Sequence, residues 1–320
     1  MSLLRDDWQE PMHEAMRVGF GRGLVDVARR DRRVVALSAD LMESVGFGEF
    51  AREVGRPRCI EVGVAEQHLV TMASGLAAMG AVPFAASYAA FSPGRNWEQI
   101  RTTICLNNQP VKLVGSHAGL NVGPDGATHQ MLEDIALMRA LPNMVVLAPG
   151  DATEAALFAA LMALDERPNY IRLPREKTPV FLAHDGLDIG KGYTLREGGD
   201  VALLGTGTMS YQLLMAAEQL AAEGIQAEVV HLPTIKPLDE AAVLAAAQKC
   251  GQVVTAEEAQ VAGGFGSAVA ELLSERRPLP VLRLGVRDAF GESGQMQELW
   301  QKHGLDVMSL AALIRQFLSR

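Results

Sequence analysis

The alternation of short apolar runs with longer amphipathic segments is the feature that most constrains the fold of this chain. Strands joined through helices pair in parallel and need helices on both faces of the sheet, so the pattern predicts an α/β fold. The predicted strands are 34–37, 59–62, 82–86, 111–115, 144–148 and 170–173, and the predicted helices are 12–28, 66–79, 97–106, 131–139 and 152–164.

The alternation stops between Arg175 and Asp200, where turn-forming segments follow one another, and then resumes. The second set has strands at 201–204, 227–232, 252–256 and 281–284, with helices at 210–223, at 239–250, from near 265 and at 310–317. A chain of 320 residues can form two cores. We therefore expect two doubly wound α/β domains, at 10–178 and 195–320, with a linker at 179–194.

Composition and charge narrow the classes of partner. The net charge of −9 argues against nucleic acid or an anionic membrane as a general partner. The N-terminus lacks the apolar core of a signal peptide, and no apolar run reaches the roughly 18 residues of a membrane-spanning helix. Cys59, Cys105 and Cys250 have no zinc-site spacing and are expected to be buried free thiols. These features favour a cytoplasmic protein.

Glu66 is an acid at the start of an otherwise apolar, small-residue helix. It follows the strand predicted at 59–62, so it should lie at a strand-to-helix turn and point into the interior. A buried carboxylate is costly and usually has a partner or a raised pKa. The alternative is an acid that stabilises the helix N-terminus through the macrodipole.

Two further segments after strands carry polar or aromatic side chains. The glycine-rich run 115–130 contains His117, Asp125 and His129, which can donate, accept and transfer protons. Tyr88 and Phe91 follow the strand at 82–86 and could stack on a planar ring, or could equally be core residues. Because open α/β sheets bind ligands at the carboxyl ends of their strands, these groups and Glu66 together predict a cofactor site.

These segments resemble the pyrimidine-binding domain of transketolases and their thiamine-diphosphate relatives. The resemblance rests on Gly-Val-Ala-Glu66-Gln-His, Ser-Tyr88-Ala-Ala-Phe91 and Gly-Pro-Asp125-Gly-Ala-Thr-His129-Gln. It extends to the C-terminal domain of transketolases through Leu232-Pro-Thr-Ile-Lys-Pro-Leu-Asp and Asp288-Ala-Phe-Gly-Glu-Ser-Gly294. Several matching segments make this resemblance specific, whereas any one of them would be weak.

The resemblance implies a role for each cofactor-binding position. In that family the acid at the Glu66 position hydrogen-bonds a ring nitrogen of the aminopyrimidine and promotes the imino tautomer that removes the thiazolium C2 proton. Tyr88 and Phe91 would pack against the aminopyrimidine, and Asp40 and Leu41 lie in a segment similar to one that reaches the cofactor rings. Because the cofactor then supplies the nucleophile, no serine or cysteine nucleophile is needed.

The resemblance also implies a sugar site. His117 and His129 would contact the sugar substrate, with His129 joining Glu66 as a catalytic residue, and Asp125 would bind a hydroxyl next to the carbonyl. The residues that line up with phosphate-holding positions are Arg17, Ser44 and Arg175. An arginine suits a phosphate because its donors bind in a bidentate manner.

Three departures from the family pattern stand out. Tyr88 occupies a position that is commonly Phe in transketolases, and Pro124 replaces a usual acid. The segment 92–97 is one residue longer than in full-length transketolases, which makes Trp97 only a candidate for the third aromatic of the pocket.

The chain lacks the Gly-Asp-Gly and downstream Asn that mark the diphosphate and magnesium site of this family. The resemblance therefore implies the C-terminal subunit of a split transketolase, active in an α2β2 assembly with an N-terminal subunit. That partner would bind the diphosphate and Mg²⁺ or Ca²⁺, so no metal ligand is expected here. The alternatives are the β subunit of a 2-oxoacid dehydrogenase, a deoxyxylulose-phosphate synthase-like enzyme and, least favoured, a non-enzymatic scaffold.

Overall fold

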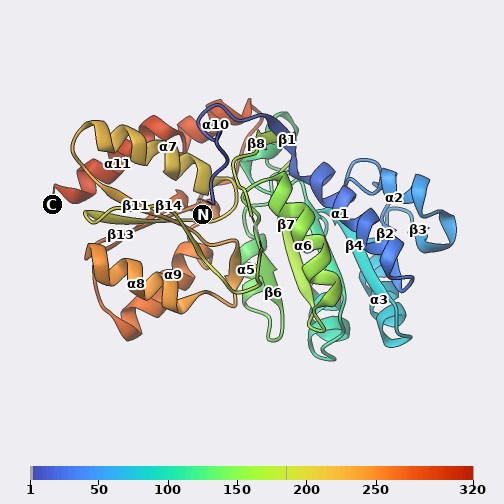
Figure 1. Ribbon diagram of the computed structural model, residues 1–320. Helices are drawn as coiled ribbons and strands as arrows, with labels where there is room; N and C mark the ends of the chain where they lie inside the picture. The colour runs from blue at the N-terminus through green and yellow to red at the C-terminus, as the bar shows by residue number, and fades with distance from the viewer. Residues whose placement is uncertain (1–2, 185, 320) are drawn as a thin grey trace.

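Two β-sheets, each covered by helices, make up the protein (Figure 1). The computed structural model describes residues 3–184 and 186–319. One sheet has seven strands in the order β12-β6-β7-β5-β4-β2-β3, the other has five in the order β14-β13-β10-β11-β9, and β1 pairs with β8. The predicted α/β fold with two helix-covered sheets is confirmed.

The seven-stranded sheet is parallel except at one edge. Its strands are β2 (Val34–Ser38), β3 (Cys59–Glu61), β4 (Val82–Tyr88), β5 (Lys112–Ser116), β6 (Val145–Leu147), β7 (Asn169–Leu173) and β12 (Thr234–Lys236). The edge strand β12 comes from the second half of the chain and pairs antiparallel with β6. The two halves of the chain therefore share this sheet.

Alternate residues of each strand face opposite layers of helices. Leu113 and Tyr170 pack towards the side of α3, whereas their neighbours Val114 and Ile171 pack towards α1 and α6. Because successive side chains of a strand point to opposite faces, a strand buried on both faces is mostly apolar. The helices and helical turns of this half are α1 (Met16–Arg30), α2 (Gly48–Glu53), η1 (Arg56–Arg58), α3 (Glu66–Ala78), α4 (Trp97–Gln99), η2 (Ile100–Cys105), η3 (Leu120–Asp125), α5 (Asp134–Arg139) and α6 (Ala152–Leu164).

The five-stranded sheet is also parallel except for one edge strand. It contains β9 (Tyr193–Arg196), β10 (Val201–Gly205), β11 (Ala227–His231), β13 (Val253–Gln260) and β14 (Val281–Val286), with β9 antiparallel to β11. Helices α7 and α11 lie on one side of it and α8 and α9 on the other (Figure 1). The helices of this half are α7 (Met209–Ala222), α8 (Glu240–Cys250), α9 (Phe265–Arg276), α10 (Met296–Lys302) and α11 (Val307–Leu318).

Several predicted boundaries were wrong because tertiary pairing competes with helical periodicity. The helix predicted from Met12 begins at Met16, since 13–15 form β1 against β8 (Lys177–Pro179). The helix predicted at 131–139 begins at Asp134, and Met131 instead forms a bridge with Ala118. Most of the helix predicted at 97–106 is wound as a π-helix, at 100–105.

The sequence patterns also missed short elements. Strands β8, β9 and β12 have three or four residues each, too few for a periodic signal, and α2 and α10 are only six and seven residues long. The cysteines are all free, but only Cys105 is buried, while Cys59 and Cys250 are half-buried. The expectation of three buried thiols was therefore wrong for two of them.

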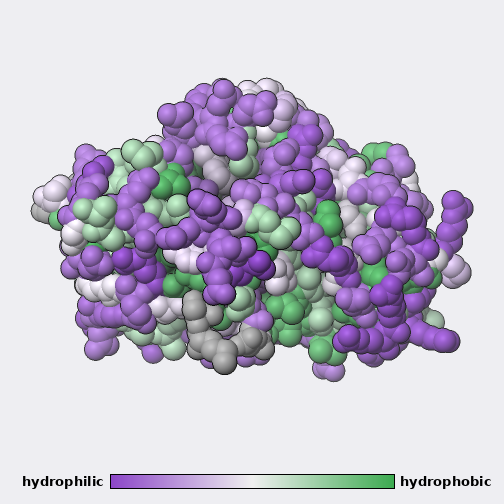
Figure 2. Space-filling model, turned by 45° about the horizontal axis from the view of Figure 1, so that its top comes forward, coloured by the Kyte–Doolittle hydropathy of each residue, from purple (hydrophilic) through white to green (hydrophobic). Residues whose placement is uncertain are grey.

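One face of the molecule is mainly polar. On the face shown in Figure 2, hydrophilic residues cover most of the area and hydrophobic ones form small separate patches. Within the described ranges, no helix is both long and apolar enough to cross a membrane.

Helices α1 and α6 pack unusually closely because of two glycines. Gly19 and Gly23 lie one turn apart on α1, facing the backbone of α6. A Cβ on Gly23 would lie 2.3 Å from the carbonyl oxygen of Ala156, and one on Gly19 would lie 2.1 Å from that of Ala152. A side chain at either position would push the two helices apart.

We predict that Gly23→Ala destabilises the protein by roughly 2–3 kcal/mol, because the added methyl meets backbone atoms that cannot rotate away. The matched control is Gly75→Ala in the last turn of α3, where a Cβ would meet nothing within 4 Å. The control should raise stability by up to about 1 kcal/mol through helix propensity. Calorimetric melting of both variants checks this, and an unchanged melting temperature for Gly23→Ala would contradict it.

Candidate functional site

The loops that follow β2, β3, β4 and β5 all leave the seven-stranded sheet at one edge. These four strands are neighbours in the sheet and run parallel. Their carboxyl ends lead to Asp40, Glu66, Tyr88 and His117. The predicted site residues of four separate segments therefore meet at the place where an open α/β sheet binds ligands.

An aromatic group of four rings forms the centre of this edge. The rings of Tyr88 and His117 are stacked with their centres 3.9 Å apart, and Phe91 stacks on Tyr88 at 6.0 Å. His129 meets Phe91 edge-on at 5.5 Å and Tyr88 at 6.3 Å. All four rings lie half-buried or buried. The two predicted aromatic residues and the two predicted histidines are therefore one continuous surface.

Glu66 is the first residue of α3 and its side chain is 2% exposed. Its carboxylate accepts a hydrogen bond of 2.6 Å from the Arg95 guanidinium. Its backbone carbonyl accepts one of 2.8 Å from the amide of the buried Asn96. The acid points into the interior, as predicted, and its partner is a cation from the loop after β4.

Two arginines lie beside the histidines. The guanidinium of Arg17, on α1, donates to the backbone carbonyl of Arg175, which follows β7. The Arg175 side chain in turn donates to the carbonyl of Val122 at 2.7 Å and lies 3.6 Å from the carboxylate of Asp125. A cavity of about 520 Å³ opens here, lined by 12–15, 17–18 and 175–177. Its charged lining is mixed, with the acids Glu14 and Glu176 beside the cations Arg17, Arg175 and Lys177. The guanidinium groups are the part of this lining that suits a small anion.

His117 is held as a neutral ring. It is 5% exposed, has a backbone φ of +57°, and its Nδ1 lies 2.9 Å from the Ser116 hydroxyl. Burial is the largest cause that lowers the pKa of His117 to about 3, and the nearby charges of Arg17 and Arg175 act in the same direction. An uncharged imidazole can donate one hydrogen bond and accept another.

Some predicted site residues are not joined to this group by contacts of the described chain. The backbone N–H of Asp40 donates to the Glu61 carboxylate at 2.6 Å, and Leu41 packs in the same hydrophobic layer as Tyr88. Ser44 is half-buried, and among the contacts of the described residues none links its side chain to the arginines. Its neighbour Gly46 does pack against the backbone of Arg17.

Trp97 is not part of the aromatic surface. Its indole N–H donates to the carbonyl of Leu137 at 3.0 Å, and its ring packs against the core on the α3 side of the sheet. Within the described part of the chain, no ring contact joins it to Tyr88 or Phe91. The possibility that Trp97 supplies a third pocket aromatic was therefore wrong.

Sequence reasoning missed Arg95, Asn96 and Gln130. Among the residues that the structure describes, the side-chain oxygens of Asn96 and Ser87 at this edge are buried and have no hydrogen-bond partner, which leaves acceptors for a ligand. Gln130 is 4% exposed and donates to the carbonyls of Gly123 and Glu292. The only sequence signal that could have identified Gln130 was its position directly after His129. Among the described residues, no group of three His, Cys, Asp or Glu side chains could hold a metal ion.

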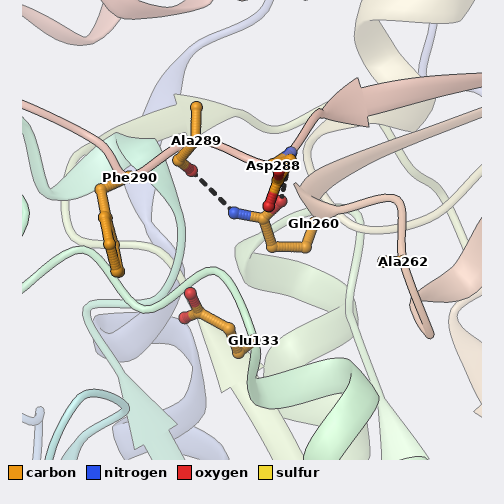
Figure 3. Close-up of a pocket in the computed structure, with 6 residues that line it drawn as sticks. All are labelled: Glu133, Gln260, Ala262, Asp288, Ala289 and Phe290. Atoms are coloured by element: carbon orange, nitrogen blue, oxygen red, sulfur yellow. Dashed lines mark hydrogen bonds between the residues drawn. The ribbon is translucent and has the colours of Figure 1, made fainter.

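A separate pocket of about 320 Å³ lies where the C-terminal half meets α5 (Figure 3). The Gln260 side chain holds the segment at 288–289 in the pocket lining. It donates to the Ala289 carbonyl at 2.7 Å and accepts from the Asp288 N–H at 3.1 Å. Glu133, Ala262 and Phe290 complete the lining. None of the predicted site residues belongs to it, so it is distinct from the Glu66 site.

Two family models cover most of the chain. Residues 13–180 match the transketolase pyrimidine-binding domain, and residues 190–310 match the transketolase C-terminal domain. Both correspond to the domains named by the resemblance of the sequence.

Curated relatives agree with these models. The chain is 43% identical over 299 residues to a 6-deoxy-6-sulfo-D-fructose transketolase subunit of Clostridium sp. (strain MSTE9), covering 93% of this chain and 92% of the relative. It is 40% identical to a putative transketolase C-terminal section of Methanocaldococcus jannaschii, covering 97% and 98%. It is also 41% identical to a 1-deoxy-D-xylulose-5-phosphate synthase of Thermomicrobium roseum, covering 94% of this chain but 48% of the relative.

Solved structures give the same answer. One described as a split gene transketolase, inactive beta4 tetramer, superposes with a TM-score of 0.89 at 42% identity, covering 95% of this chain and 98% of the other. The transketolase of Campylobacter jejuni shares the fold, with a TM-score of 0.77 at 24% identity, covering 98% of this chain and 49% of the other. With both family models and near full-length relatives in agreement, the chain belongs to the transketolase family, as a protein of the split, C-terminal type.

Proposed function

We propose that this protein is the C-terminal subunit of a two-subunit transketolase that transfers a two-carbon ketol unit between sugars or sugar phosphates with thiamine diphosphate. Its domains are taken as 10–178, binding the pyrimidine, and 195–320, with 179–194 as linker. The observation that carries the proposal is the buried Glu66, linked to Phe91 through Arg95, on the same sheet edge as two histidines and two arginines.

The residues fit the pyrimidine half of the cofactor. Glu66 offers a buried carboxyl group, Phe91 and Tyr88 offer aromatic faces, and the unpaired Asn96 oxygen lies close by. When bound, thiamine diphosphate supplies the carbon nucleophile that takes up the ketol unit. The role of Glu66 is to hold a proton between its carboxyl oxygen and a ring nitrogen, in a slot that excludes water.

The remaining site residues are proposed to bind the sugar substrate. The neutral His117 and the half-buried His129 hydrogen-bond the sugar, with His129 within reach of both aromatic rings. Asp125 binds a sugar hydroxyl, and its ion pair with Arg175 orients it. Arg17 and Arg175 line a cavity that takes the substrate phosphate. Ser44 is proposed as a further phosphate ligand. Asp40 and Leu41 approach the cofactor rings from the loop after β2.

The missing half of the cofactor site makes a partner necessary. The chain has no Gly-Asp-Gly, so we assign the diphosphate and Mg²⁺ or Ca²⁺ to an N-terminal subunit in an α2β2 assembly. The relative described as an inactive beta4 tetramer supports self-association without activity in the absence of such a subunit. In this arrangement the enzyme is a cytoplasmic transferase of sugar metabolism.

A second candidate activity has support from sequence identity. The chain is 41% identical to part of a 1-deoxy-D-xylulose-5-phosphate synthase, although it spans about half of that protein. Assaying the same reconstituted complex for 1-deoxy-D-xylulose 5-phosphate formation separates the two activities.

The experiment that tests the proposed function is a ketol-transfer assay of the chain alone and with its N-terminal partner. We predict no turnover for the isolated chain and full turnover for the complex. In the complex, Glu66→Gln should lower kcat by several hundredfold or more, roughly the contribution of a positioned acid–base group, because an amide does not share the proton.

Glu98→Gln is the matched control, because Glu98 is an exposed acid on the neighbouring α4. It should leave turnover unchanged. Near-normal turnover of Glu66→Gln in the complex would reject the proposed role, and full activity of the isolated chain would reject the need for a partner.

For Arg175→Ala we predict that KM for phosphorylated sugars rises roughly tenfold or more, because charge-assisted hydrogen bonds to the phosphate are lost. The unphosphorylated sugar is an internal control, since loss of the bond to the Val122 carbonyl affects both substrates alike. Steady-state kinetics of the complex gives both constants. Equal effects on the two substrates would remove Arg175 from the phosphate site.

Acid should destabilise the chain through His117, whose folded-state pKa of about 3 lies below the ordinary 6.5. Above pH 6.5 the ring is neutral in both states and contributes nothing to the pH dependence. Below it the unfolded chain binds a proton that the folded chain does not, which costs about 2 kcal/mol by pH 5.

Urea unfolding of the wild type and His117→Gln at pH 7.5, 6 and 5 measures this effect. His117→Gln should lose less stability between pH 7.5 and pH 5 than the wild type does. Substituting the exposed His68 by Gln is the control and should leave the slope unchanged. The same slope in wild type and His117→Gln would show that His117 is not held neutral.

A further inference from the structure

Arg95 places a flat cation on the two residues proposed to receive the aminopyrimidine. One guanidinium nitrogen donates to the Glu66 carboxylate at 2.6 Å. The central carbon of the same group lies 4.8 Å from the centre of the Phe91 ring. Arg95 therefore makes both a charge-assisted hydrogen bond to the acid and a cation–π contact with the aromatic face.

The burial of the pair is strongly unequal. The Glu66 side chain is 2% exposed, whereas the Arg95 side chain is 50% exposed. A buried carboxylate left without a partner is costly, so in the absence of another ligand the acid needs this cation. The arginine, by contrast, can return to water at little cost. When the ion pair breaks, Arg95 is therefore the partner that moves into water, and Glu66 stays buried.

The loop that carries Arg95 has a defined course. It leaves β4 after Tyr88 and doubles back at Gly94, where a Cβ would lie 2.1 Å from the Ala90 carbonyl oxygen. The next residue after Arg95 is the buried Asn96, whose amide holds the Glu66 backbone and the Ser92 hydroxyl. The backbone on both sides is therefore fixed, and only the Arg95 side chain has freedom to move.

We propose that Arg95 is an internal stand-in for the cofactor's aminopyrimidine: it occupies Glu66 and Phe91 while the chain is free of cofactor and is displaced when the cofactor binds. This rests on the proposed function. One planar group that hydrogen-bonds Glu66 and covers Phe91 is replaced by another that does the same, so the cofactor and the Arg95 side chain compete for these two residues.

The first test measures the contact itself in the cofactor-free chain. Arg95→Gln should lower the melting temperature by several degrees in the wild type and by much less in a Glu66→Gln background, where the ion pair is already lost and only the contact with Phe91 remains. Arg101→Gln removes the same charge from an exposed arginine nearby and should be silent in both backgrounds. Equal effects of Arg95→Gln in the two backgrounds would overturn the proposal.

The second test measures competition. Thiamine, which carries the aminopyrimidine without the diphosphate, is titrated into the isolated chain and followed by NMR line broadening. Thiamine diphosphate is titrated into the reconstituted complex by calorimetry. In both, Arg95→Gln should bind about tenfold tighter than the wild type, and Arg101→Gln should equal the wild type.

The outcomes separate this inference from the proposed function. If the complex binds thiamine diphosphate with equal or weaker affinity after Arg95→Gln, Arg95 is not a competitor, although the cofactor site stands. If neither wild type nor variant complex binds thiamine diphosphate, the proposed function fails and this inference with it. Circular dichroism of Arg95→Gln verifies that the variant is folded before either result is interpreted.

Discussion

The parallel pairing of β2, β3, β4 and β5 is the constraint on which the rest of the site depends. Parallel strands end at the same edge, so four loops far apart in the chain must meet there. The close packing of α1 on α6 supports this arrangement from one face, because it brings Arg17 on α1 to the residue that follows β7. The stacked rings of Tyr88 and His117 then join two adjacent loops directly.

Charge is distributed very unevenly in this molecule. The chain carries a net charge of −9, yet Arg17, Arg95 and Arg175 all lie at the same edge of one sheet. Each donates to an acceptor of the chain itself, two to backbone carbonyls and one to a carboxylate. Each guanidinium is held in place by these bonds and still has N–H groups that can bind a ligand, because a guanidinium has five N–H groups. Burial is the main cause that lowers the pKa of His117, and the charges of Arg17 and Arg175 lower it further.

The sequence patterns predicted the long elements well and the short ones poorly. Helix α6 was predicted with its observed bounds, because Ala152–Leu164 is an uninterrupted helix-forming run. Strands β8, β9 and β12 were missed because three or four residues carry no periodicity, and their pairing partners lie far away in the chain. Trp97 was a pocket candidate by position, but its indole found a carbonyl partner in the core instead. The roles of the individual site residues stay proposals.

By itself, the sequence determined the α/β class, the edge that carries the candidate site residues and the family, because these follow from periodicity and from motifs within single segments. Only the tertiary structure decided which cation neutralises Glu66, that Gln130 joins the histidine loop to the segment at Glu292, and that the two halves of the chain share a sheet. The physical reason is that these contacts join residues 29 to 162 positions apart, and Glu66 had several arginines as possible partners. Folding brings one of them, Arg95, within hydrogen-bonding distance of the buried acid.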